Sequence, residues 1–94
     1  MKKYEIMYIL KPNLEDEKRN VLIGKLHDLL AVDGTIENIN ELGIRDLAYE
    51  INDEKKGYYV VVTISASSAN GIGEFDRVAK INKNVLRHGI FKID

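Results

Sequence analysis

The sequence predicts a single α+β domain over residues 1–94, in which two helices cover one face of a four-stranded antiparallel sheet. Three observations lead to this prediction. Two runs, residues 4–10 and 58–64, are apolar on both faces, as in strands that lie inside a sheet. Leucine and isoleucine recur at helical spacing between residues 22 and 30. A chain of 94 residues is also too short for two domains that each bury an adequate core.

The first strand is expected over residues 4–10, which are rich in aromatic and β-branched side chains. Alternation places Met7 and Ile9 on one face of this strand. The other face carries its remaining apolar side chains, which are Tyr4, Ile6, Tyr8 and Leu10.

The first helix is expected to follow Lys11-Pro12-Asn13, with Asn13 as its N-cap. Acidic residues come next, where the helix dipole favours negative charge, and they are Glu15, Asp16 and Glu17. The apolar stripe consists of Leu22, Ile23, Leu26, Leu29 and Leu30. Asp33-Gly34 is expected to end the helix.

The second strand is expected over residues 35–42, where Ile36 and Ile39 break strict alternation and indicate a bulge. Residues 43–46 interrupt it. Alternation then resumes, and Leu47, Tyr49 and Ile51 are expected to key the strand into the sheet. A polar turn at residues 52–57 leads to the third strand at 58–64.

The second helix is expected to be capped by Ser67 or Ser68, and its apolar stripe consists of Ile72, Phe75, Val78 and Ala79. Residues 85–93 form the last strand. The resulting order, βαββαβ, is that of the ferredoxin-like fold, whose first and last strands are neighbours. One sheet face is then expected to lack a third layer.

Catalytic chemistry has little support in the sequence. There is no cysteine, and no zinc spacing, phosphate loop or pair of catalytic carboxylates can be found. His27 is expected on the solvated side of the first helix, and His88 is expected to serve sheet packing or RNA contact. We therefore expect no enzyme activity, no cofactor, no metal and no small-molecule substrate. The chain contains no apolar run long enough for a membrane span, so we expect no membrane association and a cytoplasmic location.

The uncovered sheet face is the first candidate interaction surface. Its apolar or small side chains would form a patch of the kind that marks a protein partner. The residues of this partner surface are Met7, Ile9, Tyr59, Val61 and Thr63. Scattered surface apolarity is the alternative.

Basic side chains form the second candidate surface. The net charge is −1, so nucleic-acid binding would depend on a local cluster rather than on overall charge. Because the first and last strands should be adjacent, Lys2, Lys3, Arg87 and His88 are expected to form one patch along that edge. An idle, solvated set of charges is the alternative.

The segment Gly43-Ile44-Arg45-Asp46-Leu47-Ala48-Tyr49-Glu50-Ile51-Asn52 resembles the signature of the bacterial small-subunit ribosomal protein six family. Further matches fall in the same order at residues 3–5, 41–43, 56–59 and 84–88, so the resemblance covers nearly the whole chain. It implies a ferredoxin-like fold. It also implies binding to the central domain of 16S ribosomal RNA together with small-subunit ribosomal protein eighteen, a small basic neighbour.

The resemblance also implies roles for single residues. Lys2, Lys3 and Tyr4 match the basic amino-terminal segment of the family, Arg45 its basic signature position and Arg87 a basic position of the last strand. With Arg77 and His88 added from the charge pattern, these residues form the expected RNA-binding set.

Three features depart from the family pattern. Many members have a basic residue where this chain has Ile44 and Asp46, so the loop is expected to bind RNA more weakly. Many have proline at the position of Glu50, and some carry an acidic tail beyond the position of Asp94.

Two rival functions remain at this stage. A regulatory module of the same fold would require a polar ligand pocket, and an acylphosphatase-type hydrolase would require a phosphate loop after the first strand. Neither feature is evident in the sequence.

Overall fold

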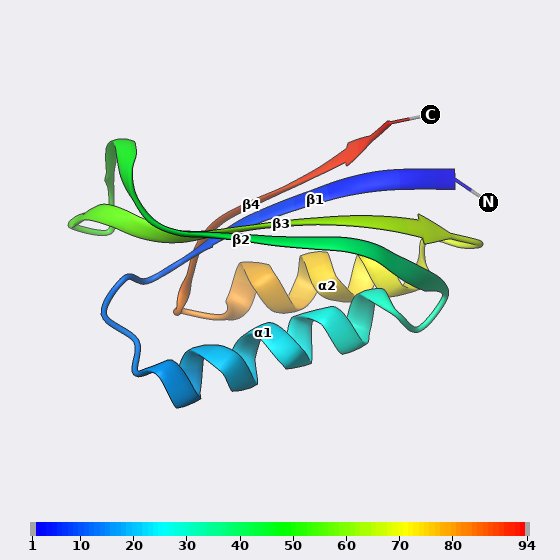
Figure 1. Cartoon of the computed structure of the whole chain (residues 1–94), viewed down its shortest axis with the longest axis horizontal. Coiled ribbons are helices and arrows are strands. Elements are labelled where there is room, and N and C mark those ends of the chain that lie inside the picture. The colour runs from blue at the N-terminus through cyan, green and yellow to red at the C-terminus, as the bar shows by residue number, and fades with distance from the viewer. Residues whose placement is uncertain (1, 94) are drawn as a thin grey trace.

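Two helices cover one face of a four-stranded antiparallel sheet in the computed structural model, which describes residues 2–93 (Figure 1). The elements are β1 (Lys2–Leu10), α1 (Asp16–Leu30), β2 (Gly34–Ile51), β3 (Glu54–Ala66), α2 (Asn70–Ile81) and β4 (Val85–Lys92). The strand order is β2-β3-β1-β4, so the two strands with apolar residues on both faces are the central ones. The predicted ferredoxin-like fold is confirmed.

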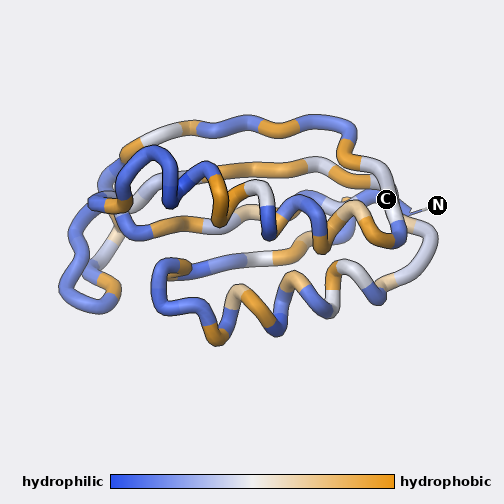
Figure 2. The backbone as a smooth tube through the Cα atoms, turned by 90° about the horizontal axis from the view of Figure 1, so that it is seen from below, coloured by the Kyte–Doolittle hydropathy of each residue, from blue (hydrophilic) through white to orange (hydrophobic). Residues whose placement is uncertain are grey.

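The hydrophobic core lies between the helices and the sheet. Alternate residues of the central strands belong to the buried core together with residues of both helices. Hydrophobic positions recur along both helices (Figure 2). The fully buried large side chains at this interface are Ile6, Tyr8, Leu10, Leu26, Leu30, Val60, Val62, Ile64 and Phe75. The core therefore follows the predicted periodicity of each element.

The ends of α1 differ from the prediction. The helix begins at Asp16 with Glu15 as its N-cap, because Pro12 and Asn13 form a turn instead. The helix ends at Leu30, before the predicted Asp33-Gly34 stop. Asp33 supports the other helix: its Oδ2 accepts a hydrogen bond from the backbone N–H of Gly71 at 3.1 Å, near the start of α2.

The bulge that the sequence predicted in the second strand is confirmed. The pairing of β2 with β3 shifts between Ile36 and Asn38, so that Glu37 is the extra residue. The register shifts again near Gly43, whose φ of +82° lies in the region that favours glycine.

A third shift contradicts the prediction for the resumed strand. Ile51 pairs with Glu54, but residues 47–50 have no partner on β3. Leu47 and Tyr49 are therefore not keyed into the sheet. The tip of the β2–β3 hairpin closes at Asn52 and Asp53, which both have positive φ.

The prediction that His27 is a solvated residue is wrong. His27 is only 8% exposed, and its Nε2 lies 2.7 Å from the hydroxyl of Tyr8. It follows Ile23 by four residues and precedes Leu30 by three, which turns it toward the core side of α1. The Tyr8 hydroxyl then satisfies the buried ring nitrogen. Burial lowers the pKa of His27 and raises the pKa of Tyr8.

Neither helix within residues 2–93 combines the length and the apolar character that a membrane span requires.

Candidate protein and nucleic-acid interface

The sheet face opposite the helices carries the predicted partner surface. Pairing places Met7 beside Val61, Ile9 beside Tyr59 and Glu5 beside Thr63. The five residues of the partner surface therefore share one face, as predicted. Four of them are partly exposed and Ile9 is buried, with 4% exposure.

The β2–β3 hairpin explains the burial of Ile9. The end of the β2–β3 hairpin curls up on the side of the sheet away from the helices (Figure 1). Gly57 lies directly beneath this contact, since a Cβ at Gly57 would collide with Ile9 Cγ2 and lie 3.3 Å from Leu47 Cδ2. The expectation of a face without any third layer is wrong at this end, because Leu47, which is not paired with β3, lies over Gly57 next to Ile9.

A hollow of about 180 Å³ lies between the hairpin and the sheet. Its lining is mainly apolar and comes from β1, β2, β3 and β4. The lining residues are Met7, Ile9, Leu47, Ala48, Tyr49, Ile51, Tyr59 and Arg87.

Arg87 and Tyr49 join the hairpin tip to the last strand. Arg87 Nη1 donates a hydrogen bond to the Tyr49 hydroxyl, and the guanidinium carbon lies 5.7 Å from the centre of the Tyr49 ring. Tyr49 therefore lies over the open face, where its hydroxyl and ring hold the Arg87 guanidinium at the rim of the hollow.

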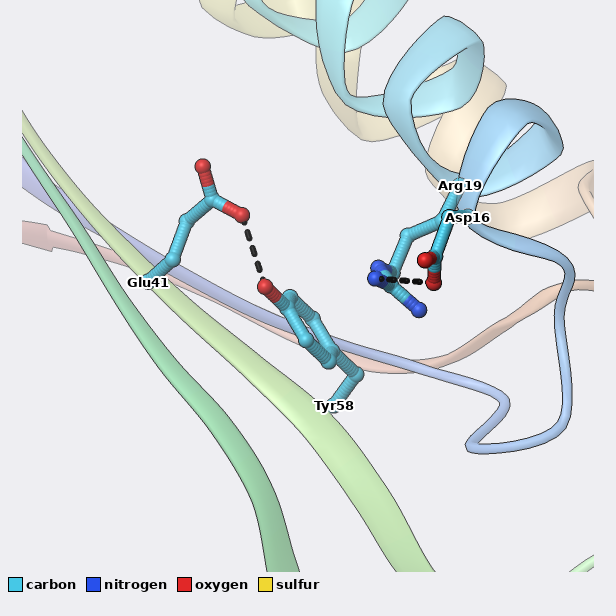
Figure 3. Close-up of polar contacts among 4 residues, drawn as sticks. All are labelled: Asp16, Arg19, Glu41 and Tyr58. Atoms are coloured by element: carbon cyan, nitrogen blue, oxygen red, sulfur yellow. Dashed lines mark hydrogen bonds and ion pairs between the residues drawn. The ribbon is translucent and has the colours of Figure 1, made fainter.

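The base of the same hairpin is attached to α1 on the other side of the sheet (Figure 3). The Arg19 guanidinium lies 4.4 Å from the centre of the Tyr58 ring and bonds Asp16 Oδ1 at 2.8 Å. The Tyr58 hydroxyl donates to Glu41 Oε1 at 2.7 Å, and this hydrogen bond raises the pKa of Tyr58. This contact is not predictable from the sequence, because no periodic pattern connects α1 with the start of the hairpin.

The predicted basic patch of Lys2, Lys3, Arg87 and His88 does not form. Lys3 pairs with Ser65 at one end of β1, whereas Arg87 pairs with Ile9 near the other end. Six residues of a strand separate these positions, which corresponds to about 20 Å. The two strands are neighbours as expected, but their antiparallel direction places the basic residues at opposite ends.

The amino-terminal part of the predicted RNA-binding set lies at the end of β1. Lys3 Nζ is 3.5 Å from Glu37 Oε1, and Ser65 donates a hydrogen bond to the same carboxylate. The hydrogen bond from Ser65 lowers the pKa of Glu37. Lys2 is exposed, and Tyr4 is partly buried against the core.

Arg45, Arg77 and His88 of this set lie in three different environments. Arg45 is exposed on the hairpin, where its Nε lies 3.5 Å from the carbonyl of Leu42. Arg77, on α2, pairs with Glu74 at 2.7 Å and lowers the pKa of that carboxyl group. His88 faces the helices, and its Nε2 lies 2.7 Å from Asp76 Oδ1.

One exposed aromatic residue was not included in the prediction. Phe91 is 52% exposed and pairs with Glu5, which places it on the open face. Its ring covers Gly89, since a Cβ there would lie 2.9 Å from Phe91 Cε2. The alternation of side chains along the last strand could have identified Phe91. It lies four residues after Arg87, and residues an even number of positions apart point to the same face of a strand.

Metal chemistry finds no support within residues 2–93, where no group of three or more histidine or acidic side chains is arranged to hold an ion.

Comparison with known proteins supports the resemblance seen in the sequence. Residues 3–92 match the family described as ribosomal protein S6. Small ribosomal subunit protein bS6 of Alkaliphilus oremlandii (strain OhILAs) is 50% identical over 94 residues, which cover 100% of this chain and 99% of that protein. The crystal structure of 30S ribosomal protein S6 from Thermotoga maritima matches with a TM-score of 0.90 at 26% identity, over 98% of this chain and 87% of that chain.

The fold, the full-length match and the family match agree with one another. The family consists of structural, non-enzymatic proteins of the small ribosomal subunit, which is cytoplasmic in bacteria. The chain belongs to the ribosomal protein S6 family.

Proposed function

We propose that this chain binds the central domain of 16S ribosomal RNA cooperatively with small-subunit ribosomal protein eighteen during assembly of the small subunit. The proposal rests on the family and on one observation: a mainly apolar hollow on the open sheet face lies beside exposed basic side chains. An apolar surface of this kind suits a protein partner, and basic side chains beside it suit RNA phosphates.

The protein partner is assigned to the open face. Met7, Tyr59, Val61 and Thr63 are partly exposed there, and Ile9 lies beneath the hairpin tip. The hairpin extends this surface with Leu47, Ala48, Tyr49 and Ile51. An apolar hollow lined by both strands and hairpin would accept side chains of the partner, which would bury the remaining apolar area.

The RNA is assigned to basic side chains at two ends of the molecule. Arg45 and Arg87 are exposed at the hairpin end, while Lys2, Lys3 and Tyr4 lie at the opposite end of β1. Arg77 and His88 belong to the proposed set as well, although Glu74 and Asp76 already engage them. Arg45 is the best-placed phosphate contact, because its guanidinium is exposed and its contact is with a backbone carbonyl.

Cooperation with a basic partner explains how a chain of net charge −1 would bind RNA. Few phosphate contacts on this chain alone would give weak binding, since each contact contributes through counterion release. A partner seated on the open face would add its own positive charge next to Arg45 and Arg87.

The test is binding to a central-domain RNA fragment at low and high salt, with and without protein eighteen. We expect weak, salt-sensitive binding alone and much tighter binding with the partner. Equal affinity with and without the partner would contradict cooperation, and no binding in any condition would contradict the RNA assignment.

A further inference from the structure

The two edges of the sheet differ in how well they are protected. The edge strand β2 is interrupted by three register shifts, and such bulges prevent another strand from pairing along it. The opposite edge, β4, pairs with β1 over six consecutive positions, from Lys92 with Tyr4 to Arg87 with Ile9, without a shift. The outer side of β4 is therefore a regular strand edge.

Hydrogen bonding at the end of β4 shows which backbone groups point outward. The N–H of Ile93 donates to the carbonyl of Lys3 at 3.0 Å, so this pair exchanges bonds with β1. In an antiparallel ladder such pairs alternate with pairs that do not exchange bonds. Phe91, Gly89 and Arg87 accordingly bond to β1. The N–H and C=O groups of His88, Ile90 and Lys92 face away from the sheet.

Charge further distinguishes the two edges. The sequence of β4, Val85–Lys92, contains Arg87, Lys92 and no acidic residue. The β2 edge instead carries four acidic residues and one basic residue, which are Glu37, Glu41, Asp46, Glu50 and Arg45. A strand added to β4 would gain from acidic side chains opposite the basic ones.

The open-face side of β4 also offers apolar contact. Phe91 is half exposed there and lies over Gly89, so the Phe91 ring is an exposed apolar surface along this edge. A side chain of a neighbouring strand on the same face would pack against that ring.

We propose that the β4 edge is a docking site for an extended, acidic segment of another protein, which adds as a fifth, antiparallel strand. The backbone groups of His88, Ile90 and Lys92 would supply the hydrogen bonds, and Arg87, Lys92 and Phe91 would select acidic and apolar side chains. This surface adjoins the hairpin hollow, with which it shares Arg87. The proposal does not depend on RNA binding.

The probe is a blocked peptide of alternating glutamate and valine, 8 residues long to match β4. It is added at millimolar concentration to the full chain labelled with ¹⁵N. We expect slowed amide hydrogen exchange at His88, Ile90 and Lys92 and unchanged exchange along β2. A matched peptide of alternating lysine and valine is expected to bind at least about tenfold more weakly, because it places like charges opposite β4.

Two variants separate the backbone contribution from the charge. Lys92→Pro removes an outward N–H at a position where an edge strand tolerates proline, whereas Lys92→Ala removes only the charge. We expect binding to weaken about tenfold in Lys92→Pro and about threefold in Lys92→Ala. Melting temperatures of both variants verify that the chain still folds.

Three results would overturn the proposal. They are unprotected amides at His88, Ile90 and Lys92 with saturating peptide, equal binding of the lysine peptide, and protection along β2 instead. Concentration-dependent protection of β4 without any peptide would overturn it in favour of self-association.

Discussion

The two faces of the sheet use the same strands but are covered in different ways. On the helix side, alternate residues in the middle of β1 and β3 are buried against α1 and α2 in one hydrophobic core. On the open side, only the hairpin end is covered, and Leu47 and Tyr49 supply that cover from β2 itself. The first face therefore stabilises the fold, while the second retains a hollow with Arg87 at its rim.

The largest expected difference between the faces is in the loss of stability when an aromatic side chain is replaced by alanine. Phe75→Ala on the helix side should lower the free energy of unfolding by about 3–5 kcal/mol, since a fully buried aromatic side chain leaves a cavity. Phe91→Ala on the open face should cost less than about 1 kcal/mol, because that ring is half exposed. Denaturant titration of both variants measures the contrast, and equal losses would show that the open face is also part of the core.

Acidification should lower the free energy of unfolding through His27, which lies on the helix side of the sheet. His27 is buried beside Tyr8 and its pKa is lowered, so the unfolded chain binds its proton more readily than the folded chain. Its stabilising contribution is present above the unfolded pKa of about 6.5 and is lost as pH falls below that value toward the lower folded pKa.

The measurement is the free energy of unfolding between pH 7 and mildly acidic pH, at values above the range in which the carboxyl groups titrate. His27→Gln cannot titrate and should remove most of the slope in this interval. If the variant retains the full slope, then a group other than His27 is responsible for it.

On the open side, Arg45→Ala should affect binding rather than folding. Arg45 is exposed and contacts one backbone carbonyl, so we expect the melting temperature to fall by no more than a few degrees. Affinity for the central-domain RNA with protein eighteen should fall several-fold, and the salt slope should decrease by about one. Lys56→Ala, at an exposed position next to the same hairpin, serves as the charge control. A large drop in melting temperature with unchanged affinity would assign Arg45 a structural role.

The smallest expected effect concerns the contact that holds the hairpin tip. Tyr49→Phe removes the hydrogen bond with Arg87 and keeps the aromatic ring. We expect a loss of about 0.5 kcal/mol or less, because both side chains are exposed. Amide exchange at residues 47–51 should increase while exchange in α1 remains unchanged. Uniformly faster exchange would mean that the tip and the core open as one unit.

Local patterns predicted the parts of this protein that depend on neighbouring residues in the chain. The two central strands, the apolar stripe of α1 and the bulge at Glu37 all follow from hydrophobic periodicity. This periodicity indicates which side of a helix or strand is buried. His27 shows where prediction from local patterns fails. Its polar side chain indicated a solvent-exposed position, but His27 is buried and forms a hydrogen bond with the hydroxyl of Tyr8 on β1, nineteen positions away in the chain.

The candidate site was predictable in part. Alternation correctly gathered Met7, Ile9, Tyr59, Val61 and Thr63 on one face. The prediction that Lys3 and Arg87 lie close together was wrong. Two residues on adjacent strands are neighbours only if the register of the strands brings them together.

The sequence by itself determined the order of the elements, the choice of central strands, the composition of the core and the family. These properties follow from apolar spacing and from a signature that lies within one stretch of chain. Tertiary structure alone decided that Leu47 folds back over Gly57 beside Ile9, that Asp33 caps the second helix, and that β4 presents a regular outer edge. Each of these depends on register or on contacts between distant segments, and the free energy that selects them arises only when the whole sheet has formed.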